Sequence, residues 1–230
     1  MAADLQAIVY TASVWVMPVL LAVTLHEAAH GWVAWKLGDD TAKTLGRVSF
    51  NPLRHIDPVG TVVLPGLLLL LSAPFLFGWA KPVPVNFRRL REPRRAMVIV
   101  AAAGPAMNFG LAYLAALMLH LMPLLPPEAA VWASANLINM IKINVILAVF
   151  NMLPLPPLDG GRVAVGLLPP ALALPLARME RFGFAIIIAI MFVIPLLSRQ
   201  LGKNIDPFAW LVIGPVNYVA RIIAIAAGIQ

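Results

Sequence analysis

Long apolar stretches, separated by polar and turn-rich segments, dominate the chain. A helix needs about 20 consecutive apolar residues to cross the hydrocarbon core of a bilayer. Stretches of this kind predict spans at roughly 5–36, 96–121, 141–157, 182–197 and 207–228. The pattern therefore predicts an all-α polytopic membrane protein with about five to six transmembrane helices.

The apolar segment 58–79 differs from the others because helix breakers interrupt it. Pro65 and Gly66 lie near its middle, and Pro74 follows. Both flanks are basic, which marks the cytoplasmic side. A segment that crosses once cannot return to the same side. We therefore expect a re-entrant segment or a tilted, broken helix, with a plain span as the alternative. Irregular backbone at membrane depth needs protein or a wet cavity beside it, so we expect this segment next to a site.

Shorter elements are predicted between the spans. Short β elements in the cytoplasmic loops are expected near 46–50, "GRVSF", and at 80–87, "AKPVPVNF". Residues 128–140 are expected to form a short interfacial helix. A further short helix is expected beyond Arg162, before the proline pair at 169–170.

Composition agrees with a membrane protein and narrows its partners. Hydrophobic residues make up 61% of the 230 residues and charged residues 12%, whereas about a quarter of a soluble domain is charged. The net charge of +7 comes mostly from Lys and Arg clusters beside the spans, which membrane orientation explains without nucleic acid. The first ten residues lack a basic n-region, so we expect a retained first span. The chain has no cysteine, which excludes a thiolate metal site and a Cys nucleophile.

The stretch "HEAAH" places ionisable residues inside the first span. His26 and His30 lie four residues apart, on one face of a helix, and can bind one Zn²⁺. Glu27 is placed to contact a water on that metal, as in the H-E-x-x-H motif. Ionisable groups in a span are costly and indicate function. The alternative is a pair of buried polar residues bonded to a neighbouring helix.

Catalytic zinc usually has three protein ligands, so a third must come from elsewhere in the chain. The candidates are His55, His120 and the six aspartates. We favour Asp159, which follows an inward-running span in the segment "NMLPLPPLDGG". The prolines there prevent regular helix hydrogen bonding, and the glycines allow backbone close to a metal. The alternatives are a capping role for Asp159 and a ligand role for His55, which lies in the cytoplasmic loop.

Three segments, "HEAAH", "AAAGPAMNF" and "NMLPLPPLDGG", resemble the signature segments of the site-2 protease family of intramembrane zinc metalloproteases, in that family's order. The resemblance covers roughly residues 20–165. It implies one zinc per chain, held by His26, His30 and Asp159, with Glu27 as the general base.

The same resemblance implies further site residues. Asn151 is expected to hold the substrate or the oxyanion, and Asn108 of the middle segment is a second candidate for that role. Gly104 and Pro105 match the middle motif, whose helix packs on the other two, and simple helix packing is their alternative explanation.

The resemblance also implies the activity and its setting. We expect hydrolysis of peptide bonds within or near transmembrane segments of membrane proteins. The site should face the cytoplasm, in the inner membrane of a prokaryotic cell. Residues 1–230 are expected to form one domain, with a catalytic core of about 5–165 and C-terminal helices of about 166–230. It is a small form, in which we expect neither a PDZ nor a CBS domain.

Partners follow from this reading. The expected partners are a transmembrane protein substrate and the lipid bilayer. A regulatory membrane partner and a second copy of the chain both stay open. The extended piece 80–87 could pair with substrate as an added strand or only brace its loop. The alternative function is a metal-ion transporter or a metal-binding membrane protein without protease activity. Few other polar residues line the spans and no internal repeat is visible, which speaks against a transporter.

Overall fold

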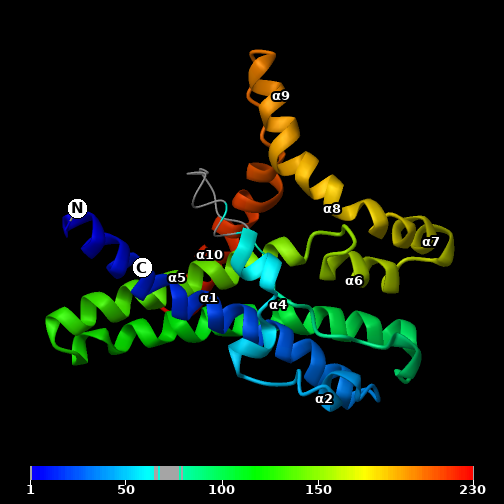
Figure 1. Ribbon diagram of the computed structural model, residues 1–230, viewed down its shortest axis with the longest axis horizontal. Coiled ribbons are helices and arrows are strands. Elements are labelled where there is room, and N and C mark those ends of the chain that lie inside the picture. The colour runs from blue at the N-terminus through cyan, green and yellow to red at the C-terminus, as the bar shows by residue number, and fades with distance from the viewer. Residues whose placement is uncertain (1, 65–66, 68–77, 79, 230) are drawn as a thin grey trace.

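The structure, a computed structural model, describes residues 2–64, 67, 78 and 80–229, and these residues are arranged almost entirely as helices. The α-helices are α1 (Ala2–Lys36), α2 (Thr41–Thr44), α4 (Pro93–Met118), α5 (Pro127–Asn151), α6 (Asp159–Leu167), α7 (Pro170–Arg178), α8 (Glu180–Ile188), α9 (Ile194–Gln200) and α10 (Gly214–Ala226) (Figure 1). Short 3₁₀ turns are η1 (Pro52–His55), η3 (Phe87–Arg89) and η4 (Leu119–Leu124), and π-helical turns are η2 (Pro58–Val63), η5 (Ala189–Val193) and η6 (Ala209–Ile213).

The predicted all-α membrane architecture is confirmed for the described part of the chain. Five helices there are long and apolar enough to cross a membrane, namely Leu5–Lys36, Pro93–Leu124, Pro127–Asn151, Glu180–Gln200 and Ala209–Ala226. The separate interfacial helix at 128–140 is wrong. Residues 128–151 contain neither proline nor glycine, so α5 continues unbroken to Asn151.

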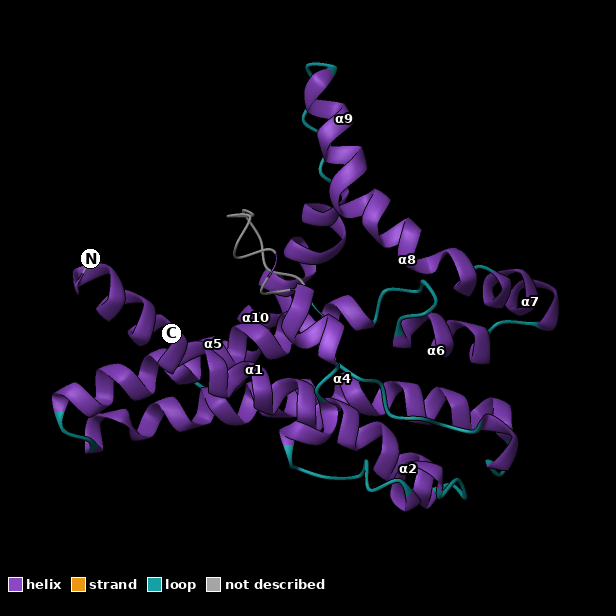
Figure 2. Ribbon diagram, viewed as in Figure 1, coloured by secondary structure: helices purple, strands orange, loops and turns teal. Residues whose placement is uncertain are grey.

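The predicted short β elements are also wrong, because the described residues contain no strand (Figure 2). Residues 46–50 form a turn and irregular backbone. Residues 80–86 are irregular and do not pair with another strand. Their backbone groups bond instead to side chains and to a loop carbonyl, as when the Asn86 N–H donates to Asp39 Oδ2 at 2.6 Å. Pro82 and Pro84 have no backbone N–H to donate to a strand ladder, which also disfavours a sheet here.

Helix α4 lies at the centre of the fold and packs against α1, α5 and α6. Small residues at its contacts, including Gly104, Ala112 and Ala116, are buried. Small side chains let helix backbones approach closely in a membrane, where the contact depends on van der Waals packing. This close packing brings α1 and α6 to the same stretch of α4.

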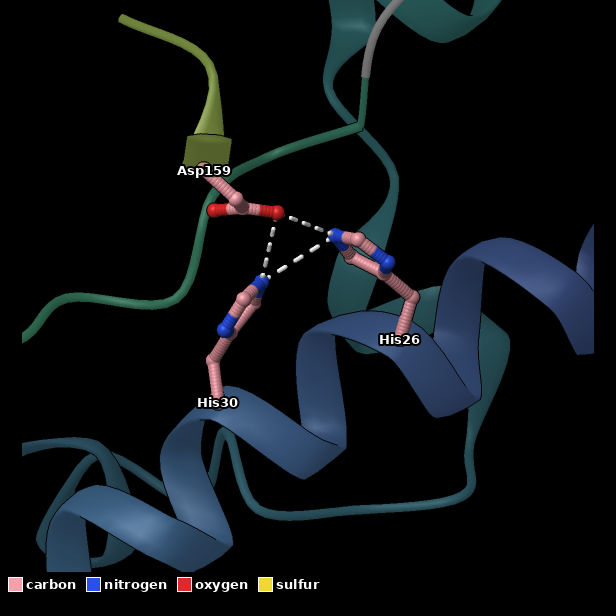
Figure 3. A group of neighbouring side chains, drawn as sticks. All are labelled: His26, His30 and Asp159. Carbon is pink, nitrogen blue, oxygen red and sulfur yellow. Dashed lines mark hydrogen bonds and ion pairs between the residues drawn. The ribbon is translucent and has the colours of Figure 1, made fainter. Parts of the chain in front are cut away.

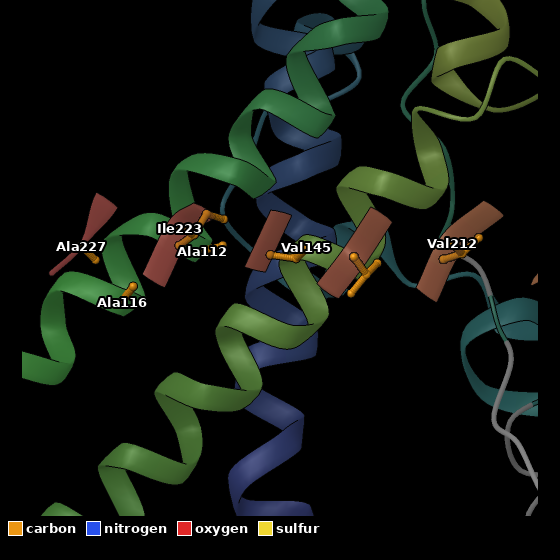
Figure 4. Close-up of a cluster of buried hydrophobic side chains, with 7 residues drawn as sticks. Ala112, Ala116, Val145, Val212, Ile223 and Ala227 are labelled. Carbon is orange, nitrogen blue, oxygen red and sulfur yellow. The ribbon is translucent and has the colours of Figure 1, made fainter. Parts of the chain in front are cut away.

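A second cluster attaches the C-terminal helix to this centre. Figure 4 shows Ala112 and Ala116 of α4 and Val145 of α5 facing side chains of the last helical segment. Those side chains are Val212, Val216, Ile223 and Ala227. Glu180–Gln200, by contrast, projects away from the bundle in Figure 1. The C-terminal helix therefore supports the central helices through apolar contacts.

A sharp change of direction separates α5 from α6. Regular helix ends at Asn151, and the proline-rich residues 152–158 make turns before α6 begins at Asp159. Side chains at Gly160 and Gly161 would overlap the backbone of this turn, so glycine is needed at both. At the other end of α6, Arg94 Nε on α4 donates to the Gly166 carbonyl at 2.9 Å. The start of α6 is thus packed on the turn, and its far end is bonded to α4.

The predicted re-entrant segment 58–79 falls largely on residues outside the described ones. Its first part, Pro58–Val63, forms η2, while residues 65–66, 68–77 and 79 are not described. The described residues at its two ends meet, because the Lys81 N–H donates to the His55 carbonyl at 2.9 Å. The residues just before and just after segment 58–79 therefore lie side by side.

This junction predicts the sidedness of two positions. In the cysteine-free chain, single cysteines placed at Asp57 and Lys81 should react with a membrane-impermeant thiol reagent from the same side. The measurement is labelling of intact cells against inverted vesicles. A cysteine at Glu128, at the start of the third candidate span, should react only from the opposite side. Labelling of positions 57 and 81 from opposite sides would contradict the contact.

Candidate metal centre

Three potential metal ligands from distant parts of the chain meet in a buried cluster (Figure 3). His26 and His30 lie one turn apart on α1, and Asp159 is the first residue of α6. The two Nε2 atoms are 3.1 Å apart, and each lies 3.3 Å from Asp159 Oδ2. Ligands about 2.0–2.1 Å from a tetrahedral zinc would lie roughly 3.3 Å from one another. The spacing therefore fits three ligands of one zinc.

The outer nitrogens of both imidazoles face oxygen atoms. His30 Nδ1 lies 2.7 Å from the Val100 carbonyl, and His26 Nδ1 lies 2.6 Å from Asn108 Oδ1. Oxygen acceptors at Nδ1 place the ring hydrogen there and leave Nε2 with a lone pair. Second partners of this kind orient histidine ligands in metal sites.

The third atom of the cluster, Asp159 Oδ2, is buried and lacks a hydrogen-bond donor among the described residues. Two bare ring nitrogens and this carboxylate oxygen then face one another without a hydrogen between them, which is unfavourable in a buried site. A cation at their centre would satisfy all three. The donor set of two histidines and one aspartate is of the kind that catalytic zinc takes.

Helix α4 approaches the histidines so closely that only glycine fits at position 104. A Cβ there would lie 2.5 Å from His26 Cε1 and 2.7 Å from His26 Nε2, and it would also overlap His30 Nε2. Contacts under about 3.0 Å force atoms to move. The glycine of "AAAGPAMNF" thus leaves room for the rings, and this goes beyond simple helix packing.

Glu27 enters the same cavity from the next position of α1. Its Oε2 accepts a hydrogen bond of 2.7 Å from the Val83 N–H. The segment 80–86 therefore lies over the site and orients this carboxylate. Val83 contributes only its backbone N–H to this bond. The residue type at position 83 therefore gives no indication of the contact, and the sequence did not predict it.

Two polar anchors hold the segment 80–86 in place. Asp39 Oδ2 accepts from the Asn86 N–H at 2.6 Å, and Arg47 Nη2 donates to the Lys81 carbonyl at 2.6 Å. Burial tends to raise the pKa of Asp39, but hydrogen bonds from Thr41 and Asn86 outweigh it and hold that pKa below its usual value. Asp39 therefore remains an ionised acceptor at neutral pH.

The cluster opens into a cavity of about 340 Å³. Asn151, predicted to hold substrate, lines this cavity together with Glu27. One Asn151 Nδ2 hydrogen is donated to the Leu147 carbonyl at 3.0 Å, and an amide nitrogen carries a second. The other lining residues are His26, His30, Ala80, Pro82, Val83, Val85, Phe87, Val100, Ala101, Pro157, Asp159 and Arg162.

The structure does not place Asn108 at the cavity. Its side chain is fully buried behind His26, and its amide bonds to His26, to the Ala22 carbonyl and to Asn144. Contact with substrate would require breaking these bonds. The Asn108 side chain therefore lies behind the His26 ring, on the side away from the cavity.

The alternative third ligands lie elsewhere. His55 Nε2 lies 3.0 Å from the Ser49 carbonyl, and His120 Nε2 lies 2.7 Å from the Ala227 carbonyl.

Arg162, which the sequence did not single out, lines the cavity. Its guanidinium carbon lies 5.9 Å from the Phe87 ring centroid, and its Nη2 lies 3.8 Å from Glu180 Oε1. Its position directly after "LDGG" was the available signal.

Comparison with known proteins agrees with this geometry. The sequence profile of Peptidase family M50 matches residues 125–194. YwhC of Bacillus subtilis (strain 168) is 42% identical over 195 residues, covering 83% of this chain and 85% of YwhC. Rip2 of Mycolicibacterium smegmatis is 30% identical over 182 residues, covering 78% of this chain and 66% of Rip2. Both relatives are provisionally named zinc metalloproteases. No solved structure matches.

The chain therefore belongs to peptidase family M50. The predicted resemblance to the site-2 protease family is confirmed, and the protein is a metalloprotease. The five long apolar helices among its described residues make it an integral, multi-pass membrane protein.

The close approach at position 104 predicts the effect of a single methyl group. Gly104→Ala should weaken zinc binding on the order of 10-fold or more, as loss of outer-shell support does in other metal sites. Helical content should be retained. The measurement is zinc affinity of purified protein in competition with a chelator. Gly110→Ala on the same helix is the control, because a Cβ there meets nothing within 4 Å. Equal zinc affinity in both variants would contradict the prediction, because it would show that α4 or the histidine rings can move to accept the methyl group.

Proposed function

We propose that this M50 metalloprotease cleaves membrane proteins within or near their transmembrane segments, using one zinc held by His26, His30 and Asp159. The observation that carries the proposal is the position of the donor cluster. Two of its members lie within Leu5–Lys36, a helix apolar enough to cross a membrane. A site in that position reaches substrates that are themselves embedded in the bilayer.

The three donors can hold the metal without rearrangement of the bundle. Both histidines present Nε2 to Asp159 Oδ2, and all three side chains are buried. Bound zinc supplies the Lewis acid that makes a water nucleophilic near neutral pH and polarises the scissile carbonyl. The protein supplies the fixed positions, through α1, α4 and α6.

Glu27 is the general base. Its carboxylate lines the cavity beside the donors, and the Val83 N–H fixes one of its oxygens. The other oxygen takes the proton from the attacking water. The same group then returns this proton to the leaving amine, so that one carboxylate serves both halves of the hydrolysis.

Asn151 is proposed to hold the substrate carbonyl or the oxyanion that develops from it. It lines the cavity and keeps one amide hydrogen beyond the bond to Leu147. A preset donor of this kind stabilises developing charge without reorganisation. Asn108 is proposed to orient His26, because its Oδ1 lies 2.6 Å from His26 Nδ1. Its side chain is not part of the cavity lining.

The substrate is proposed to be a transmembrane helix that unwinds locally. The residues 80–86 line one wall of the cavity in irregular, partly extended form, and an unwound peptide could pair with their backbone. His26 and His30 lie toward the end of α1 that precedes the basic residues Lys36 and Lys43. By the positive-inside rule, these basic residues support a site that faces the cytoplasm. The proposed location is the inner membrane of a prokaryotic cell.

Replacing the base should separate metal binding from cleavage. Glu27→Gln should retain zinc and lose roughly 100-fold or more of the hydrolysis rate, because an amide cannot accept the proton. The measurement compares membrane proteomes of cells that produce wild-type or Glu27→Gln protein. Transmembrane substrates should accumulate in the variant. Cleavage at the wild-type rate would remove Glu27 from the mechanism.

Each ligand should be needed for the metal. Purified wild-type protein should hold about one zinc per chain, as one three-ligand site implies. His26→Ala, His30→Ala and Asp159→Ala should each lose most of it by elemental analysis. His120→Ala is the control, because that ring bonds to the Ala227 carbonyl. Zinc flux into proteoliposomes without any proteolysis would support transport instead.

A further inference from the structure

Behind His26, a chain of buried amides runs through three helices. His26 Nδ1 on α1 lies 2.6 Å from Asn108 Oδ1 on α4. Asn108 Nδ2 donates to Asn144 Oδ1 on α5 at 2.7 Å. Asn144 Nδ2 in turn donates to the Met140 carbonyl at 2.9 Å. Asn108 and Asn144 are both 0% exposed, so bulk water does not reach their side chains.

The direction of this chain is fixed at its far end. The Met140 carbonyl can only accept, so Asn144 must point its NH₂ group there and its oxygen toward Asn108. Asn108 must then point its NH₂ group toward Asn144, and the same group also donates to the Ala22 carbonyl at 3.2 Å. Its oxygen is left facing His26. A neutral imidazole carries one ring hydrogen, which Nδ1 must therefore hold.

The two histidines differ in what fixes them. His30 Nδ1 faces the Val100 carbonyl directly, and a backbone carbonyl cannot reverse its role. His26 depends on a side-chain amide, whose oxygen and nitrogen can exchange places by a rotation. Only the bonds from Asn108 to Asn144 and to Ala22 prevent that exchange. His26 is thus the ligand whose ring hydrogen is open to control from elsewhere.

We infer that Asn144 is a positioning residue for the metal centre. Acting through Asn108, it holds the ring hydrogen of His26 on Nδ1 and keeps the lone pair of Nε2 directed at the metal position. This inference rests on the proposed zinc-ligand role of His26. Without Asn144, one buried bond of Asn108 is lost, and the reversed amide becomes accessible. A share of the molecules would then carry the hydrogen on Nε2, where it blocks metal binding.

A merely structural role for Asn144 has a matched comparison on the same helix. Asn139 is also buried, and its Nδ2 donates to the Val14 carbonyl at 3.0 Å. That bond joins α5 to α1 and has no connection to His26. Asn139→Leu and Asn144→Leu therefore remove the same group from one helix, and only the second interrupts the path to the ligand.

The experiment reads the ring hydrogen directly. Protein with ¹⁵N-labelled histidine is prepared free of metal in detergent micelles, and ring nitrogen shifts report the tautomer of each of the four histidines. In the wild type, Nδ1 of His26 and Nδ1 of His30 should both carry a hydrogen, whether or not Nε2 holds a second one toward Asp159. Asn144→Leu should leave part of the His26 population without a hydrogen on Nδ1 and leave His30 unchanged. Zinc affinity, measured by chelator competition, should fall on the order of 10-fold. Asn139→Leu should change neither.

Asn144→Asp tests the direction of the hydrogen bonds while keeping a polar side chain of the same size at position 144. A protonated carboxyl at this buried position can donate to the Met140 carbonyl and accept from Asn108, so the tautomer of His26 and the zinc affinity should stay close to wild type. If Asn144→Leu fails to fold, a shifted tautomer in Asn144→Asp would itself overturn the inference.

Two outcomes distinguish this inference from the proposed function. If Asn144→Leu and Asn139→Leu give the same His26 tautomer and the same zinc affinity, Asn144 only joins helices, and the zinc protease proposal is unaffected. If the wild type binds no zinc, the proposed function fails. The tautomers of the metal-free proteins still decide whether Asn144 directs His26.

Discussion

The fold is organised by the need to hold three lone-pair-bearing atoms within 3.3 Å of one another inside an apolar bundle. Such an arrangement is unfavourable unless a cation joins the atoms and each ligand is oriented from behind. The orientation comes from α4, which supplies the Val100 carbonyl and the Asn108 amide on either side of Gly104. One helix thus provides both the partners that aim the rings and the space that admits them.

The remaining features of the core serve to bring Asp159 to this position. Prolines end the regular helix after Asn151, and the glycines that follow the aspartate let α6 pack against the resulting turn. Arg94 fixes the opposite end of α6 through the Gly166 carbonyl. The packing of Val145 against the C-terminal helix keeps α5 and α4 together at a distance from the site. Apolar contacts therefore set the positions of helices, and a few directional bonds set the positions of atoms.

Much of the site could be predicted from the sequence because its chemistry depends on local spacing. The interval between His26 and His30 places both rings on one helix face, and ionisable groups in an apolar span point to function. Proline and glycine around Asp159 identified the place where backbone leaves the helix. These are local signals, and they do not depend on which other segments lie nearby.

The parts that could not be predicted depend on contacts between distant segments. Val83 acts through its backbone, so its bond to Glu27 leaves no trace in residue type. The place of Asn108 behind His26 depends on how α4 packs against both α1 and α5, which also pack against each other. The β element predicted at 80–87 was wrong because Pro82 and Pro84 cannot donate to a strand ladder, and side chains such as Asp39 bond to the backbone of this segment instead.

The hydrogen bond between Lys81 and the His55 carbonyl has an architectural consequence. The residues that flank segment 58–79 are therefore in direct backbone contact. This contact ties η1, which packs on α1, to the segment 80–86 that carries the Val83 N–H. The position of the Glu27 carboxylate is thereby coupled to the loop that follows α1.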